Sequence, residues 1–147
     1  MNHKNYMNLA LEEAKKGAAE GGIPIGSVIV VDGDVIGSGH NKRIQEGSAV
    51  LHREMDALEN AGRLKSAVYQ SATLYTTLSP CPMCAGAILL YKIPRVVIGE
   101  NRSFIGEEEL LQKRGVEVIV LDDEKCRRIM AEFIEINPEL WAEDIGE

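Results

Sequence analysis

Residues 72–91 of this 147-residue chain read ATLYTTLSPCPMCAGAILLY, and they indicate its fold class. The first seven residues, 72–78, include β-branched and aromatic side chains and predict a strand. Pro80 must end this strand because proline has no amide hydrogen to donate to a sheet. A helix is expected to begin around residues 81–84, and its almost wholly apolar body at 85–91 indicates that it is buried. A strand that leads directly into a buried helix is typical of an α/β domain.

The rest of the chain continues this alternation of helices and strands. Apolar residues at helical spacing predict a first helix over residues 6–20, and Asp32-Gly33 between two apolar runs predicts a β-hairpin. The other expected elements are strands at 25–31, 35–36, 95–99 and 116–121, a helix from about His52 to Gly62, and a last helix capped by Asp122 or Asp123. The two late strands are expected to be covered on both faces, and residues 138–147 to form a tail. This order predicts one α/β domain over residues 1–147, with helices on both faces of a central five-stranded mixed sheet.

Composition disfavours several classes of protein. The chain is 45% hydrophobic and 27% charged, as in ordinary folded domains. Its 16 Lys and Arg residues against 23 Asp and Glu residues give a net charge of −7, whereas a nucleic-acid partner requires concentrated positive charge. The acidic run at 107–109 is expected to be a solvated face. No apolar run approaches the roughly 20 residues of a membrane span. Three cysteines, an odd number, cannot all pair in disulfides, so we expect a cytoplasmic protein whose thiols are free or bound to metal.

One histidine and two cysteines lie at predicted helix starts, where zinc ligands can converge. His52 opens one helix, and Cys81 and Cys84 open the helix that follows the 72–78 strand. One imidazole and two thiolates supply three ligands of a tetrahedral zinc ion and leave the fourth position for water, as catalytic zinc requires. The remaining thiol, Cys126, falls within the last helix and is expected to be a packed position. We therefore expect one zinc ion per chain.

Glu54 follows His52 by two residues, so on a helix it cannot share the metal-facing side. A carboxylate beside the metal can take a proton from zinc-bound water and return it to a substrate nitrogen. Taken alone, a Cys-x-x-Cys pair can be a redox dithiol or two buried thiols, and a histidine or glutamate at a helix start is usually structural. The order His-x-Glu and then Pro-Cys-x-x-Cys is the signature of zinc deaminases, so the combination favours a hydrolytic deaminase.

Six further stretches extend over nearly the whole chain. They are GGIPIG at 21–26, GHNKR at 39–43, LENAGRL at 58–64, LYTTLSPC at 74–81, GEN at 99–101 and WAEDIGE at 141–147. They resemble the small fungal-type cytosine deaminases, and the WxEDIGE ending is far more specific than the zinc motif that all cytidine deaminase-like enzymes share. The resemblance implies the three-layer α/β/α cytidine deaminase-like fold, a homodimer, and conversion of free cytosine to uracil and ammonia in pyrimidine salvage.

The resemblance also implies roles for polar residues of the site. The residues that would hold zinc are His52, Cys81 and Cys84. Glu54 would shuttle protons, and the backbone carbonyl of Ser79 would accept the exocyclic amine of the substrate. Asn41 would pair with the pyrimidine edge, and the Asp144 carboxylate would accept a ring N–H.

Apolar walls around the base are implied as well. Phe104 and Trp141 match aromatic residues that sandwich it, and Ile25 matches an apolar contact. Trp141 belongs to the tail at 138–147, which the resemblance makes a lid over the pocket. The family normally has a small residue between the histidine and the glutamate, and here that residue is Arg53. If its backbone N–H meets the substrate, the side chain can point away; if the guanidinium enters the pocket, it bears on the choice of substrate.

Three alternatives to a cytosine deaminase stay open. A deaminase of guanine, a related heterocycle or a nucleoside would carry the same zinc motif. A tRNA adenosine deaminase is disfavoured by the net charge of −7 and the lack of basic clusters. A structural zinc-binding module without turnover would leave Glu54 and an open coordination position without a role.

Overall fold

Five strands form a mixed sheet at the centre of the computed structural model, which describes residues 2–147. The order of strands across the sheet is β2-β1-β3-β4-β5. β1 pairs antiparallel with β2 and β3, whereas β3, β4 and β5 run parallel to one another. The strands are β1 (Gly26–Val31), β2 (Asp34–His40), β3 (Ala72–Leu78), β4 (Arg95–Glu100) and β5 (Glu117–Val120). The expectation of a five-stranded mixed sheet is confirmed.

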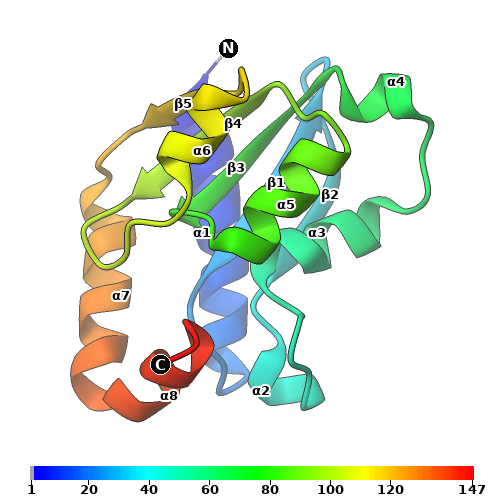
Figure 1. Cartoon of the computed structure of the whole chain (residues 1–147). Coiled ribbons are helices and arrows are strands. Elements are labelled where there is room, and N and C mark those ends of the chain that lie inside the picture. Colours follow the sequence, from blue (N-terminus) through cyan, green and yellow to red (C-terminus); the bar gives the residue numbers. More distant parts are fainter. Residues whose placement is uncertain (1) are drawn as a thin grey trace.

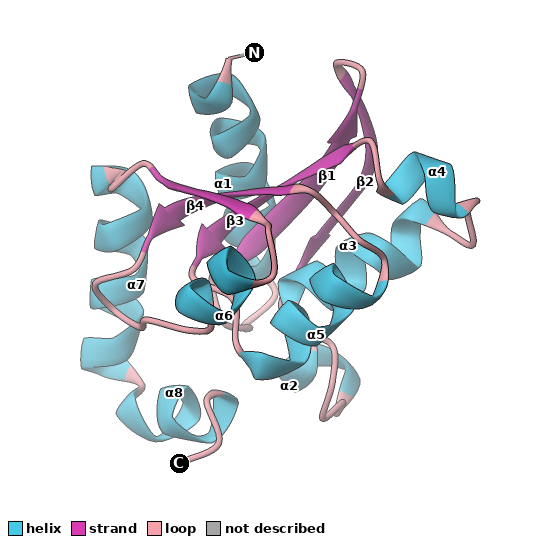
Figure 2. Cartoon of the chain, turned by 45° about the horizontal axis from the view of Figure 1, so that its top comes forward, coloured by secondary structure: helices cyan, strands magenta, loops and turns pink. Residues whose placement is uncertain are grey.

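Helices cover both faces of this sheet. The helices are α1 (His3–Ala19), α2 (Arg43–Glu46), α3 (Arg53–Ala61), α4 (Ser66–Tyr69), α5 (Pro82–Leu90), α6 (Glu108–Lys113), α7 (Glu124–Ile136) and α8 (Pro138–Asp144). Figure 1 shows α1 behind the sheet, where residues of α1 and α7 pack into one apolar cluster, and Figure 2 shows α3, α5 and α6 across the other face. The domain therefore has the three-layer α/β/α arrangement that the sequence predicted.

Alternation along the strands divides the core between these two faces. Val28 and Tyr75 pack into one apolar cluster with α1 and α7. Their neighbours Ile29 and Leu74 pack into the other cluster, with residues of α3 and α5. Successive side chains of a strand point to opposite faces, so continuous apolar runs fit strands that are buried on both sides.

The junction between β3 and α5 forms as residues 72–91 predict. All seven residues of β3 are buried, and α5 begins at Pro82 with Cys81 in the capping position before it. Proline is favoured at the first helical position because the helix has no use there for an amide hydrogen. The start of α3, with His52 before it, lies near the same edge of the sheet (Figure 1).

Three expectations about the later part of the chain are wrong. Residues 138–147 do not form a loose tail, because residues 138–144 form α8. The sequence also predicted no helix between β4 and β5, where the structure has α6. Both helices have fewer than eight residues, too few to show a clear apolar period in the sequence. β5 is only partly buried, because it lies at the edge of the sheet rather than between other strands.

Two turn and cap predictions are confirmed. Asp32 and Gly33 have φ values of 49° and 82°, the left-handed backbone of a tight hairpin turn. Asp123 caps α7 by accepting hydrogen bonds from the amides of Lys125 and Cys126. Within residues 2–147, no helix is both long and apolar enough to cross a membrane.

Candidate active site

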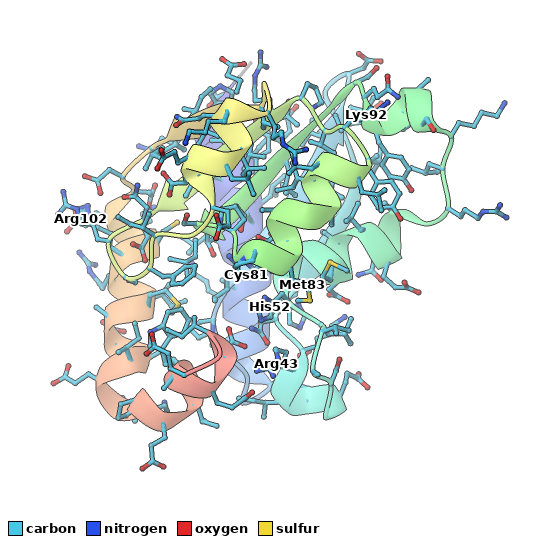
Figure 3. All side chains as sticks on the ribbon, viewed as in Figure 1. Arg43, His52, Cys81, Met83, Lys92 and Arg102 are labelled. Carbon is cyan, nitrogen blue, oxygen red and sulfur yellow. The ribbon has the colours of Figure 1, made fainter. Side chains whose placement is uncertain are left out.

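Three predicted zinc ligands converge where α3 and α5 begin. His52 precedes the first residue of α3, Cys81 precedes α5, and Cys84 lies in the first turn of α5. His52 Nδ1 is 3.3 Å from Cys81 Sγ and 3.8 Å from Cys84 Sγ. Figure 3 shows His52 and Cys81 side by side near the start of α5. Two segments 29 residues apart thus bring one nitrogen and two sulfur atoms together.

This set of donors fits a zinc ion. The three donor atoms all lie within 4.8 Å of one another, and all three residues are buried. Donor atoms of a tetrahedral zinc site stand about 3.5–3.8 Å apart, given Zn–S and Zn–N bonds of about 2.3 and 2.0 Å. Three protein ligands leave one coordination position for a reactant, which is the arrangement of catalytic rather than structural zinc.

The cysteines of the chain differ in their electrostatic surroundings. Hydrogen bonding from Cys84, together with that from His52, lowers the pKa of Cys81 to about 3 and so favours its thiolate. Burial raises the pKa of the Cys126 thiol, which packs in the apolar cluster under α1 and α7. The hydrogen bond with Cys81, together with burial, raises the pKa of Cys84 well above its usual value, so within this pair it is Cys81 that favours the thiolate. Position separates the three cysteines more clearly: Cys81 and Cys84 lie beside His52, whereas Cys126 packs in another cluster.

Glu54 lies beside the zinc ligands in the first turn of α3. Its side chain is completely buried, and neither carboxylate oxygen has a hydrogen-bond partner among residues 2–147. Burial raises the pKa of the Glu54 carboxyl, while the positive charge of Arg53 opposes that rise. Leaving a buried carboxylate without hydrogen bonds costs free energy, so such a group is more typical of a reactive site than of a structural one.

Arg53 does not point to solvent. Its residue is 2% exposed, and Nε lies 2.6 Å from Glu54 Oε1. Arg53 Nε and Glu54 Oε1 therefore form an ion pair but not a hydrogen bond, because the Nε–H points to Thr76 Oγ1 at 3.3 Å. Nη2 donates to the backbone carbonyls of Leu78 and Ser79, at 3.0 and 2.8 Å. Of the two orientations open from the sequence, the structure has the guanidinium inside, bonded to the carbonyl expected to accept the substrate amine.

Asp144 connects the C-terminal helix to His52, one of the predicted zinc ligands. Its carboxylate oxygen Oδ1 lies 3.5 Å from His52 Nε2 and accepts a hydrogen bond from Asn41 Nδ2 at 3.0 Å. Burial by itself would raise the pKa of this carboxyl, but hydrogen bonding to His52 and Asn41 holds it below its usual value. A carboxylate behind a metal-binding imidazole fixes the ring orientation, with Nδ1 left free for the metal. The structure therefore brings Asn41 and Asp144 together at the zinc site.

Arg43 is a residue of this site that sequence reasoning missed. Nη1 and Nη2 donate to the two carboxylate oxygens of Glu143 at 2.7 and 2.6 Å, and Nη1 also reaches Asp144 Oδ1 at 3.2 Å. Nε donates to the carbonyl of Ala49, and Figure 3 places Arg43 just below His52. The GHNKR stretch contains Arg43, but no local pattern connects it to residues about 100 positions later.

The predicted aromatic walls lie in one apolar cluster with Ile25. Trp141 is 8% exposed and packs with Ile25, while Phe104 contacts them from the loop before α6. The two rings meet edge to face, with centroids 6.3 Å apart and planes at 88°. They therefore touch each other here and are not parallel walls, because edge-to-face packing is the favoured contact of two aromatic rings.

The Ser79 hydroxyl has a contact that the sequence did not suggest. It donates to Glu108 Oε2 at 2.6 Å and accepts from the Gly106 amide at 2.9 Å. Glu108 Oε1 also accepts from Asn101 Nδ2. The expectation of a solvated acidic face at 107–109 is wrong for Glu108, which ties the loop after β4 to the residue before the cysteine motif.

Comparison with known proteins bears on this arrangement. Residues 1–100 match the family described as the cytidine and deoxycytidylate deaminase zinc-binding region. The chain is 58% identical to a cytosine deaminase of Candida albicans over 145 residues, which cover 98% of this chain and 97% of that protein. It is 44% identical to a tRNA-specific adenosine deaminase of Bacillus subtilis over 95 residues, 64% of this chain and 59% of that protein. The solved guanine deaminase of Bacillus subtilis superposes with a TM-score of 0.61 at 30% identity, covering 80% of this chain and 73% of that one.

Proposed function

The chain belongs to the cytidine and deoxycytidylate deaminase family, and on this premise we propose that it hydrolyses free cytosine to uracil and ammonia with one zinc ion per chain. The observation that carries the proposal is the similarity to the Candida albicans cytosine deaminase, which extends over 98% of this chain. The similarity to tRNA-specific adenosine deaminases is weaker, at 44% identity over 64% of this chain for one and 40% identity over 86% for another. The net charge of −7 also disfavours a tRNA substrate, because RNA binding depends on contacts to phosphates.

Glu54 is proposed to move the protons of this reaction. Zinc held by His52, Cys81 and Cys84 would supply Lewis-acid activation of the attacking water. Glu54 accepts a proton from that water as it attacks C4 of cytosine, and protonates ring N3. Glu54 then takes the second proton from the new hydroxyl on C4 and passes it to the amino group, which leaves as ammonia, so that the added oxygen becomes the 4-oxo group of uracil. The buried carboxylate without a hydrogen-bond partner supports this role.

Asn41 and Asp144 are proposed to hold the edge of the base. The Asn41 amide offers both a donor and an acceptor, as a pyrimidine edge requires. The Asp144 carboxylate, which His52 and Asn41 keep ionised, would accept a ring N–H. Ile25, Phe104 and Trp141 would supply apolar contact to the ring faces, since they already form one cluster beside α8. The Ser79 backbone carbonyl is proposed to receive the amine once Arg53 leaves it.

We propose that the protein forms a homodimer through the face that carries α3, α4 and α5. Leu90 is 70% exposed and Tyr91 is 40% exposed on this face. Beside them is a hollow of about 510 Å³, lined in part by Met55, Leu58 and Tyr69. Adjacent exposed apolar side chains around a hollow are typical of a surface that another protein covers.

A cytoplasmic location and a place in pyrimidine salvage complete the proposal. Cys81, Cys84 and Cys126 are all free thiols in the structure, and thiols persist in the reducing cytoplasm. A hydrolase of free cytosine would supply uracil to reactions that reuse free bases.

The substrate can be tested by ammonia release. The zinc-loaded protein is incubated separately with cytosine, cytidine, guanine and adenine, and we expect ammonia from cytosine alone. Release from guanine or from a nucleoside alone would overturn the substrate assignment and leave the zinc chemistry in place.

Metal analysis of the same preparation tests the zinc site. We expect about one zinc per chain, with zinc lost in Cys84→Ser and kept in the matched control Cys126→Ser. Full activity after removal of all metal would contradict the mechanism.

A further inference from the structure

We propose that Arg53 is a specificity-determining residue, because its guanidinium presents hydrogen-bond donors where an amino group of the substrate needs an acceptor. This inference rests on the proposed function, since it concerns the reacting end of a base at the zinc site. It goes beyond that function by predicting that the site favours an oxo group over an amino group. It also predicts that the guanidinium limits the turnover of cytosine.

The position of Arg53 places it among the reacting groups. It lies between His52 and Glu54 in sequence, and its Nε is 2.6 Å from Glu54 Oε1. Arg53 is buried together with Glu54, with side chains only 3% and 1% exposed. A guanidinium stays positively charged and offers five N–H donors but no acceptor. Whatever lies against it must therefore supply oxygen or nitrogen lone pairs.

The backbone acceptors of this region are already engaged. Nη2 donates to the carbonyl of Leu78 at 3.0 Å and to that of Ser79 at 2.8 Å. Ser79 lies two residues before Cys81, one of the predicted zinc ligands. The amino group of cytosine is a donor and, as it leaves, needs such a carbonyl. With the guanidinium in place, the amino group of cytosine meets the N–H donors of Arg53 instead of a free carbonyl.

The remaining nitrogen of Arg53 determines what the site can hold in place of an amine. Nε is directed to Thr76 Oγ1, and both hydrogens of Nη2 are used by the two carbonyls. Nη1 makes no hydrogen bond to any residue in the described part of the chain, 2–147. It is therefore the donor available to a ligand, and it matches the 4-oxo group of uracil rather than the 4-amino group of cytosine. Hydrogen bonds to charged groups are strong enough for a preference of about 10-fold or more.

Binding to a protein that does not turn over tests this preference. In the zinc-loaded Glu54→Gln protein, which keeps an oxygen beside Arg53, calorimetry gives the Kd of cytosine and of uracil. We expect uracil to bind about 10-fold more tightly or better. Equal affinities, or a preference for cytosine, would overturn the inference.

Two further substitutions separate the donors of Arg53 from its bulk. Arg53→Gly in the same background frees both carbonyls, and we expect the preference to reverse towards cytosine. Arg53→Met keeps an extended side chain without donors, and we expect it to lose the uracil preference without a gain for cytosine. Circular dichroism and zinc content check that each variant is folded. If Arg53→Gly does not fold, the uracil preference of Arg53→Met is compared with that of the protein that keeps Arg53. An unchanged preference in Arg53→Met contradicts the inference.

Turnover distinguishes this inference from the proposed function. With Glu54 intact, we expect Arg53→Gly to raise kcat/KM for cytosine about 10-fold or more over the natural sequence. Ammonia release from cytosine in neither protein would contradict the proposed function, while the affinities would still decide the role of Arg53. Normal cytosine turnover together with no preference for uracil would support the proposed function and contradict the role of Arg53.

Discussion

The proposed metal end and the proposed base end of the site are built in different ways. At the metal end, His52, Cys81 and Cys84 lie at the starts of two helices, and Glu54 lies in the first turn of the helix that follows His52. At the base end, Asn41 contacts a residue that is 103 positions later in the chain. One end is specified by short motifs, and the other exists only because α8 packs against the loop after β2.

This difference separates the chemistry from the recognition of the substrate. The short motifs contain the proposed metal ligands and the proposed proton carrier, and the proteins that this chain resembles include deaminases named for cytosine, guanine and tRNA adenosine. The base end supplies groups that can distinguish one base from another. Changes at the metal end should therefore reduce kcat, and changes at the base end should mainly affect binding.

The largest effect is expected from Glu54→Gln at the metal end. We expect kcat for cytosine to fall about 10²–10⁴-fold, because the amide cannot carry the proton that general acid–base catalysis requires. Zinc content and thermal stability should stay close to those of the natural sequence, since Gln has the same shape. The checks are steady-state kinetics, metal analysis and a melting curve, and near-normal turnover would refute the proton-shuttle role.

An intermediate effect is expected from Asp144→Asn, which links the two ends. Asp144 lies 3.5 Å from His52 Nε2 and accepts a hydrogen bond from Asn41. Replacing a carboxylate behind a metal-binding histidine costs about 10–100-fold in metal affinity or activity. We expect a loss of that size in kcat/KM, measured together with zinc affinity by competition with a chelator. Glu147→Gln, also in the C-terminal segment but exposed, is the control; equal losses in both variants would mean that Asp144 has no special place.

The smallest effect is expected from Arg43→Met at the base end. This change removes the two-bonded contact with Glu143 that holds α8 against the loop after β2, together with the 3.2 Å contact with Asp144. Since Glu143 is 62% exposed, the pair contributes modestly, and we expect KM for cytosine to rise about 3–5-fold with kcat nearly unchanged. Arg128→Met removes an exposed ion pair with Glu124 on α7 and is the control for the loss of an arginine charge away from the site. A fall in kcat with no change in KM would show that Arg43 acts on chemistry instead.

The predictability of the fold follows the same division. β3 and α5 are predicted because strand-forming residues, a proline and an apolar helix body follow one another within residues 72–91. α8 was not predicted, because it has only seven residues and is stabilised by the burial of Trp141 and Asp144. Local propensity is a weak signal in so short a helix, and tertiary packing decides whether it forms.

The sequence by itself determined the donor set, the position of Glu54 and the α/β order of elements. Each of these depends on neighbouring residues, because a helix start sets the directions of side chains within one turn. Only the tertiary structure decided that Asp144 meets His52 and that Arg43 holds α8. It also decided that the Arg53 guanidinium lies inside on the Ser79 carbonyl, where sequence left two orientations open. These contacts depend on how segments distant in the chain pack, and no local pattern encodes that packing.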